Sequence, residues 1–149
     1  MLTSPRTQHT PWMLYVEDLP INVFLMEKLF EQVPDLRLVV STSGEQAWET
    51  IQHETPTLLM LDLHLPDCYG VDLLQRLRTH PTCKNVPAVA VTAEMQFRCE
   101  GTGFLEIWHK PLNVPHVLSR LGHYARDLKV PHGSGRSLPS SHSWSTLAV

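Results

Sequence analysis

The sequence predicts an α/β fold in which a doubly wound, five-stranded parallel sheet carries helices on both faces. Two observations support this prediction. Short apolar runs alternate along the chain with longer segments of helical periodicity, and residues 58–61 contain no polar residue, as a central strand buried on both faces requires. The length of 149 residues, 42% of them hydrophobic, suits one domain with one core.

Each expected strand is a short apolar run. The runs are residues 13–16, 36–40, 58–61, 88–91 and 104–108. The last run is less uniform than the others because Glu106 interrupts it. We therefore expect five strands.

Four segments between and after these runs have clear helical periodicity. Pro20 suits the first turn of the first helix, and Ser43 can cap the second. The apolar positions of the four helices are, in chain order, Ile21, Phe24, Leu25 and Leu29; Ala47, Trp48 and Ile51; Leu73, Leu74 and Leu77; and Val117, Leu121, Tyr124 and Leu128. Residues 93–101 are only weakly periodic, so a helix there is expected to be short.

The composition excludes several classes of protein. A formal charge of −3 gives no basic field for nucleic acid or anionic lipid, and no apolar run is long enough for a membrane span or a signal peptide. A cytoplasmic protein is therefore expected. The three cysteines and nine histidines lack metal-ligand spacing, which favours reduced thiols and disfavours a zinc site. We expect flexible tails at 1–11 and 131–149, one domain over 12–130, and no output domain after it.

Polar side chains follow four of the five runs. Glu17 and Asp18 follow the first, Asp62 the third, Thr92 the fourth and Lys110 the fifth. Since the carboxyl ends of parallel strands meet at one edge, these side chains should converge. Carboxylates near 4 Å apart repel by about 4 kcal/mol per pair at an effective dielectric of roughly 20, so we expect a hard cation such as Mg²⁺ there. A carboxylate nucleophile beside a hydroxyl and an ammonium suits a phosphoryl group.

The segments that hold these residues form a recognisable set. They are Tyr-Val-Glu-Asp at 15–18, Asp-x-x-x-Pro-x-x-x-Gly at 62–70, Val-Thr-Ala at 91–93 and Lys-Pro at 110–111. In this order they resemble the receiver domain of two-component response regulators over roughly residues 12–128. The resemblance implies the flavodoxin-like, CheY-like arrangement of the same α/β fold.

The resemblance also implies a role for each site residue. Asp62 would accept the phosphoryl group, and Mg²⁺ would bind Asp18, Asp62 and the main-chain carbonyl of His64, with Glu17 acting largely through metal-bound water. Thr92 would be the switch hydroxyl and Lys110 the cation that senses the phosphate. Pro111 would follow a cis peptide bond.

The same resemblance implies the partners. The donor would be a phosphohistidine on a sensor histidine kinase or a histidine phosphotransfer protein, or a small molecule such as acetyl phosphate. The domain would catalyse its own phosphorylation and dephosphorylation without being an enzyme for a separate substrate. An unidentified downstream protein would read a shifted surface.

The sequence departs from the family pattern in two places. Ile107 stands where the family has an aromatic residue, and Trp108 should point to the opposite face. The segment between Thr92 and Lys110 is short, which would trim or unravel the family's fourth helix. We therefore hypothesise that the protein signals through an altered face, with Trp108 or Phe97 exposed there.

His64 and Glu94 lie two residues after Asp62 and Thr92, respectively, and are expected to be neighbours. Such a pair could orient water or screen the phosphoryl group. The alternative is an exposed loop histidine of which only the backbone carbonyl is used.

Three other functions compete with the receiver hypothesis. A pseudo-receiver would keep the fold as an unphosphorylated interaction scaffold. A haloacid-dehalogenase-like phosphatase would need a second Asp two residues after the first, where this chain has His64. A flavodoxin-like carrier would need a Ser/Thr/Gly-rich phosphate cradle, but the loop after the first strand is acidic.

Overall fold

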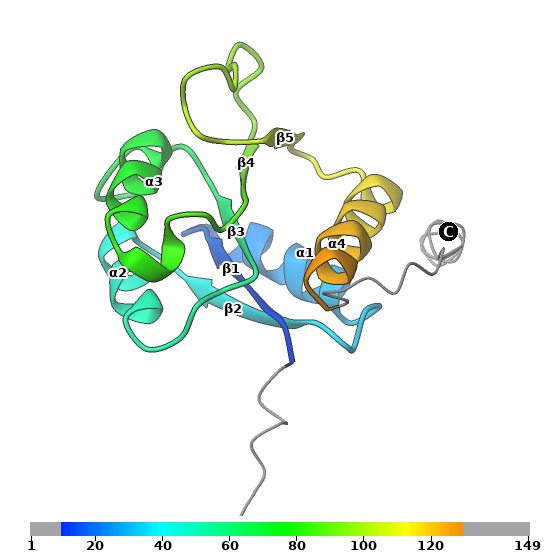
Figure 1. Cartoon of the computed structure of the whole chain (residues 1–149). Coiled ribbons are helices and arrows are strands. Elements are labelled where there is room, and N and C mark those ends of the chain that lie inside the picture. Colours follow the sequence, from blue (N-terminus) through cyan, green and yellow to red (C-terminus); the bar gives the residue numbers. More distant parts are fainter. Residues whose placement is uncertain (1–9, 130–149) are drawn as a thin grey trace, which may run out of the picture.

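A computed structural model describes residues 10–129, with side chains through residue 126, so the tails expected at 1–11 and 131–149 fall almost entirely outside it. Five parallel strands form one sheet in the order β2-β1-β3-β4-β5 (Figure 1). The elements are β1 (Trp12–Val16), α1 (Pro20–Phe30), β2 (Arg37–Ser41), α2 (Gly44–Ile51), β3 (Leu58–Leu61), α3 (Gly70–Arg78), a 3₁₀ turn (Pro81–Cys83), β4 (Ala88–Thr92), β5 (Glu106–His109) and α4 (Val114–Lys129). The predicted doubly wound fold is confirmed, and each strand bound lies within two residues of its prediction.

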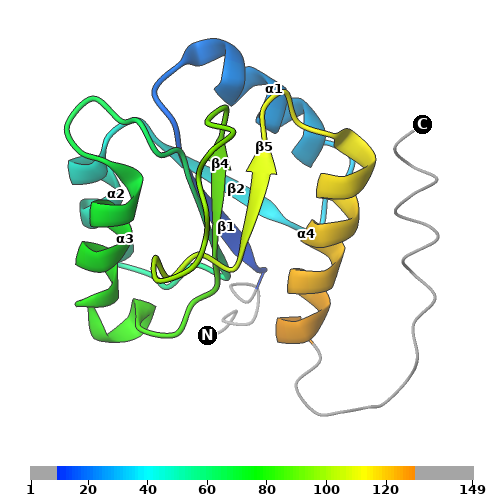
Figure 2. The same cartoon turned by 90° about the horizontal axis from the view of Figure 1, so that it is seen from above.

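Helices cover both faces of the sheet, and each face has its own core. Helices α1 and α4 lie on one side and α2 and α3 on the other (Figures 1 and 2). The first core packs Met13, Tyr15 and Trp108 against α1 and α4, and the second packs Leu14 and Leu61 against α2 and α3. Because successive strand side chains point to opposite faces, one apolar strand supplies both cores.

Helices α2, α3 and α4 have the predicted buried faces. The Ser43 hydroxyl caps α2 by accepting a hydrogen bond from the Gln46 N–H over 3.1 Å. Leu73, Leu74 and Leu77 of α3 are buried. Val117, Leu121 and Tyr124 of α4 are buried as well, whereas Leu128 lies beyond the described side chains. Within residues 10–129, no helix combines the length and apolarity needed to cross a membrane.

The predicted core stripe of α1 is wrong at three of its four positions. Ile21, Phe24 and Leu25 are 61%, 50% and 49% exposed, and the helix instead buries Met26, Leu29 and Phe30. The physical reason is that α1 is apolar on more than one side, so that two stripes of helical spacing compete for the sheet.

The segment between β4 and β5 contains no helix. Residues 93–105 form turns and irregular backbone that runs beside β4 (Figure 2). The unravelling expected from the shortness of this segment is therefore confirmed. The hypothesis that Trp108 is exposed there is wrong, since Trp108 is 1% exposed and packs on the α4 side. Phe97 is half-buried against Phe104, with ring centroids 6.0 Å apart.

An ion pair joins β5 to α4. The Glu106 carboxylate accepts hydrogen bonds from Arg120 at 2.6 to 3.1 Å, from the Tyr124 hydroxyl at 2.5 Å and from the Trp108 indole at 2.9 Å. Burial raises the pKa of Glu106, but the bonds from Arg120 and Tyr124 outweigh it and hold that pKa below its usual value. The charge of Glu106 in the irregular fifth run thus has a partner on the last helix.

Candidate functional site

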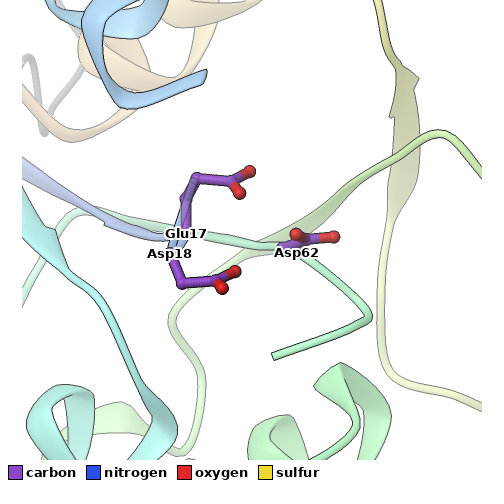
Figure 3. Close-up of side chains that lie close together, drawn as sticks. All are labelled: Glu17, Asp18 and Asp62. Atoms are coloured by element: carbon purple, nitrogen blue, oxygen red, sulfur yellow. The ribbon is translucent and has the colours of Figure 1, made fainter. Parts of the chain in front are cut away.

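Three carboxylates gather at the carboxyl edge of the sheet. Residues Val16 and Leu61 are register partners in neighbouring parallel strands, so the residues that follow them come side by side. Glu17, Asp18 and Asp62 each offer one carboxylate oxygen, and these oxygens lie within 4.8 Å of one another (Figure 3). This confirms the predicted convergence of the three acids.

Lys110 provides the positive charge nearest to these acids in the described part of the chain. Its Nζ lies 2.7 Å from Glu17 Oε1 and 3.3 Å from Asp62 Oδ2, and its side chain is only 15% exposed. The Lys110 N–H also donates to the Thr92 carbonyl over 2.9 Å, which holds the chain after β5 against β4. The peptide bond before Pro111 is cis, as the family resemblance implies.

Glu17 is fully buried and has a donor for each oxygen. The Tyr15 hydroxyl and Lys110 donate to Oε1, and the Leu19 N–H donates to Oε2 over 3.1 Å. Burial raises the pKa of Glu17, but these hydrogen bonds and the charge of Lys110 outweigh burial and lower that pKa. The pKa of the Tyr15 phenol is raised by its burial and by the Glu17 charge, so the phenol stays a donor. Glu17 is therefore an anion at neutral pH.

Asp62 has fewer donors than Glu17. Burial and then the charge of Glu17 raise the pKa of Asp62, and Lys110 only partly opposes them. Its Oδ1 accepts from the His64 N–H over 3.4 Å. A carboxylate that is poorly neutralised in this way gains from a cation beside it.

We call the site formed by Glu17, Asp18, Asp62 and Lys110 the acidic crevice. Thr92 and His64 lie beside it, because their backbones are hydrogen-bonded to Lys110 and Asp62, respectively. Thr92 is fully buried at the end of β4, and its hydroxyl accepts from the Glu94 N–H over 2.9 Å. The expected neighbourhood of His64 and Glu94 is confirmed, since His64 Nε2 lies 3.0 Å from Glu94 Oε1. The His64 ring also lies 5.4 Å from the Tyr69 ring, centroid to centroid. These contacts join the loops that follow β3 and β4.

Two residues that help shape the site are not predicted from the sequence as functional. Tyr15 belongs to an apolar strand, where its hydroxyl is easily overlooked, although a buried Tyr hydroxyl usually has a partner. Gly70 lies so close to the chain that a Cβ there would collide with the Asp62 carbonyl and the Leu63 Cα. The Gly of the Asp-x-x-x-Pro-x-x-x-Gly segment thus permits the loop to fold back under Asp62.

The donor set fits Mg²⁺. Hard divalent cations prefer oxygen ligands and keep several waters at open sites, and this crevice offers three carboxylates with oxygens close together. Lys110 alone leaves this acidic cluster short of positive charge. Asp18 and Asp62 are the best direct ligands, because both Glu17 oxygens already accept hydrogen bonds.

A doubly wound sheet with three clustered carboxylates at its carboxyl edge defines the class as an α/β domain with an acidic site at the strand ends. The family model for the response regulator receiver domain matches residues 13–121, so the chain belongs to this family of two-component signalling domains. It is 25% identical over 122 residues to the polar-differentiation response regulator DivK of Brucella ovis, covering 79% of this chain and 98% of DivK.

Solved structures show the same fold. The receiver domain of a sensor histidine kinase from Pseudomonas aeruginosa, described with a magnesium ion coordinated in its active-site cleft, has a TM-score of 0.70 and 23% identity over 76% of this chain and 96% of its own. A CheY-like receiver domain from Methylobacillus flagellatus has a TM-score of 0.69, with 23% identity over 76% of this chain and 98% of its own. The chain spans only 16% of a longer response-regulator-like protein of rice.

Proposed function

We propose that this receiver domain accepts a phosphoryl group on Asp62 in a Mg²⁺-dependent reaction. The observation that supports this most is the position of the Asp62 carboxylate, which lies close to two other acids and 3.3 Å from the ammonium of Lys110. Glu17 is buried beside the same neighbours, but both of its oxygens already accept hydrogen bonds from three donors, which leaves Asp62 as the freer nucleophile. Glu106, a partly buried acid outside this cluster, pairs with Arg120 instead.

The transfer is a displacement at phosphorus. An oxygen of Asp62 forms a bond to phosphorus while the bond from phosphorus to the donor atom breaks, and the bonding electron pair leaves with the acetate oxygen or the imidazole nitrogen. Mg²⁺, when bound, supplies positive charge to the phosphoryl oxygens. Lys110 neutralises part of the charge that Asp62 gains, and the Thr92 hydroxyl is the donor we assign to a phosphoryl oxygen.

Several residues of the chain would hold the metal. We assign Asp18, Asp62 and the main-chain carbonyl of His64 as direct ligands, and Glu17 as a residue that acts through water. The hydrogen bonds already made by both Glu17 oxygens support this indirect role.

We propose that the physiological donor is the phosphohistidine of a sensor histidine kinase or a histidine phosphotransfer protein in the cytoplasm. An exposed apolar patch, which we call the α1 patch, follows directly after Asp18. It consists of four side chains that are each about half exposed or more, namely Leu19, Ile21, Phe24 and Leu25. An apolar groove beside it is lined by Leu25 and Leu29 of α1 and by Pro111 and Leu112 after Lys110. A protein donor therefore has an apolar surface next to the phosphoacceptor.

A second candidate is an unphosphorylated scaffold. Two departures from the family pattern favour this function. Ile107 replaces the family's aromatic residue, and the helix between β4 and β5 is missing. The aromatic residue and that helix both belong to the usual output machinery of the family. The complete set of acidic residues and Lys110 favours phosphorylation. The two functions differ in whether the protein takes up a phosphoryl group, which can be measured.

The experiment is intact-mass analysis after incubation with Mg²⁺ and acetyl phosphate. We expect an adduct of one phosphoryl group that is absent from Asp62→Asn and absent after chelation of the metal. Asp35→Asn, which removes an exposed acid on the turn before β2, is the matched control and should be labelled like the parent. An unlabelled parent would leave the scaffold as the function.

A further inference from the structure

One buried hydrogen bond at the site comes from a residue that the transfer itself does not use. The Tyr15 hydroxyl donates to Glu17 Oε1 over 3.0 Å, and the two residues are 1% and 0% exposed. Tyr15 lies in β1 and packs in the core beneath α1 and α4. Its hydroxyl therefore reaches the crevice from inside the protein.

Tyr15 and Lys110 share one oxygen of Glu17. Lys110 Nζ donates to the same Oε1 over 2.7 Å and lies 3.3 Å from Asp62 Oδ2. The second oxygen of Glu17, Oε2, accepts from the Leu19 N–H instead. Because the Tyr15 hydroxyl already stabilises the negative charge of Oε1, that oxygen attracts the ammonium of Lys110 less strongly than it would without the hydroxyl.

We propose that Tyr15 is a positioning residue whose hydroxyl keeps Lys110 shared between Glu17 and Asp62. The inference rests on the proposed phosphoryl transfer to Asp62. A transferring phosphoryl group brings new negative oxygens next to Asp62, and Lys110 must move from Glu17 toward them. Without the hydroxyl, Lys110 is the sole donor to Oε1 and is held more firmly by Glu17.

The hydroxyl acts on the side of Glu17 that faces Lys110. Oε2 keeps its own donor, and Asp18 makes no contact with Tyr15 among the described hydrogen bonds. Loss of the hydroxyl should therefore slow the transfer without weakening the metal site. This separates positioning of Lys110 from a general loosening of the crevice.

The test compares Tyr15→Phe with Tyr124→Phe. Both substitutions remove a buried hydroxyl that donates to a carboxylate, but Tyr124 serves Glu106 on the α4 side. Phenylalanine keeps the ring in the core, and circular dichroism melting curves check that both variants fold. The initial rate of phosphoryl incorporation from acetyl phosphate is measured by intact mass over a range of Mg²⁺ concentrations.

We expect the maximal rate of Tyr15→Phe to fall about tenfold, the low end of the effect expected when a charged group loses one hydrogen bond, while the half-saturating Mg²⁺ concentration changes less than about twofold. Tyr124→Phe should keep the parent's rate. An unchanged maximal rate in Tyr15→Phe, or a change confined to the Mg²⁺ requirement, would overturn the inference and leave the proposed function standing. A parent that takes no phosphoryl group would overturn both.

Discussion

The side chain of His64 lies at the surface, two residues after Asp62. It is 69% exposed, and its contact with Glu94 joins the loop that carries Asp62 to the loop that begins at Thr92. Because the His64 N–H donates to Asp62 Oδ1 over 3.4 Å, the loop that carries this polar pair is attached to the phosphoacceptor. We favour the hypothesis that the pair screens the phosphoryl group over the alternative that it orients the attacking water.

Removal of this screen should shorten the lifetime of the aspartyl phosphate. For His64→Ala we expect the phosphoryl group to be lost about threefold faster, in keeping with the loss of one exposed polar contact. The measurement is the decay of the phosphorylated mass after the donor has been removed. His53→Ala, which alters an exposed histidine after α2, should decay like the parent. Equal rates for His64→Ala and the parent would leave the imidazole without a role.

The elements beside the crevice differ in how they are held. Strand β5 is an edge strand whose attachment to α4 depends on Glu106 and Arg120, with side chains 20% and 32% exposed. By contrast, the ion pair between Arg37 and Glu54 is about half exposed on both sides. A partly buried pair such as Glu106 and Arg120 leaves a poorly compensated charge when one partner is removed, whereas exposed pairs contribute little.

Glu106→Gln should therefore destabilise the fold by about 2 kcal/mol at neutral pH. The pKa of Glu106 is lowered in the folded protein, so its contribution is complete above the ordinary carboxyl pKa and is lost as the pH falls through the folded pKa. The difference in unfolding free energy between parent and variant, from urea titrations, should shrink as the pH falls below 4.5, the ordinary value for this group. Glu54→Gln is the matched control and should change little at either pH. A difference that does not depend on pH would contradict the assignment.

The elements also show what a single sequence can predict. Glu17, Asp18 and Asp62 are predictable because each follows directly on an apolar run, and parallel strands end at one edge. The buried side of α1 is not predictable, because its apolar residues satisfy more than one helical stripe. The hydroxyl of Tyr15 escapes notice for a related reason. A Tyr within a buried strand has the pattern of an apolar residue, and only the fold shows that its polar end reaches Glu17.

At the scale of the whole molecule, the acidic crevice is a cost to stability that the proposed Mg²⁺ would offset. Three carboxylates lie with oxygens within 4.8 Å of one another, and Lys110 is bonded to only two of them. A ligand that binds only the folded state stabilises it by mass action. The proposed metal site therefore predicts that the stability of the protein depends on Mg²⁺.

Mg²⁺ should raise the unfolding free energy by about 1.4 kcal/mol at ten times its dissociation constant. The measurement is urea unfolding in chelator and in Mg²⁺. In Asp18→Asn, which removes one proposed ligand, the gain at the same Mg²⁺ concentration should be much smaller, while Asp35→Asn should keep the full gain. A gain of equal size in Asp18→Asn would place the ion elsewhere.

The bond between Lys110 and Glu17 joins positions 93 residues apart, and every strand of the sheet lies between those two residues or ends just before them. During synthesis, the first carboxylate thus leaves the ribosome long before its ammonium partner. A nascent chain that has not yet emerged beyond the Lys-Pro step has no complete crevice, whatever helices it has already formed. Under the proposed function, a chain becomes able to accept a phosphoryl group only after the final strand has joined the sheet.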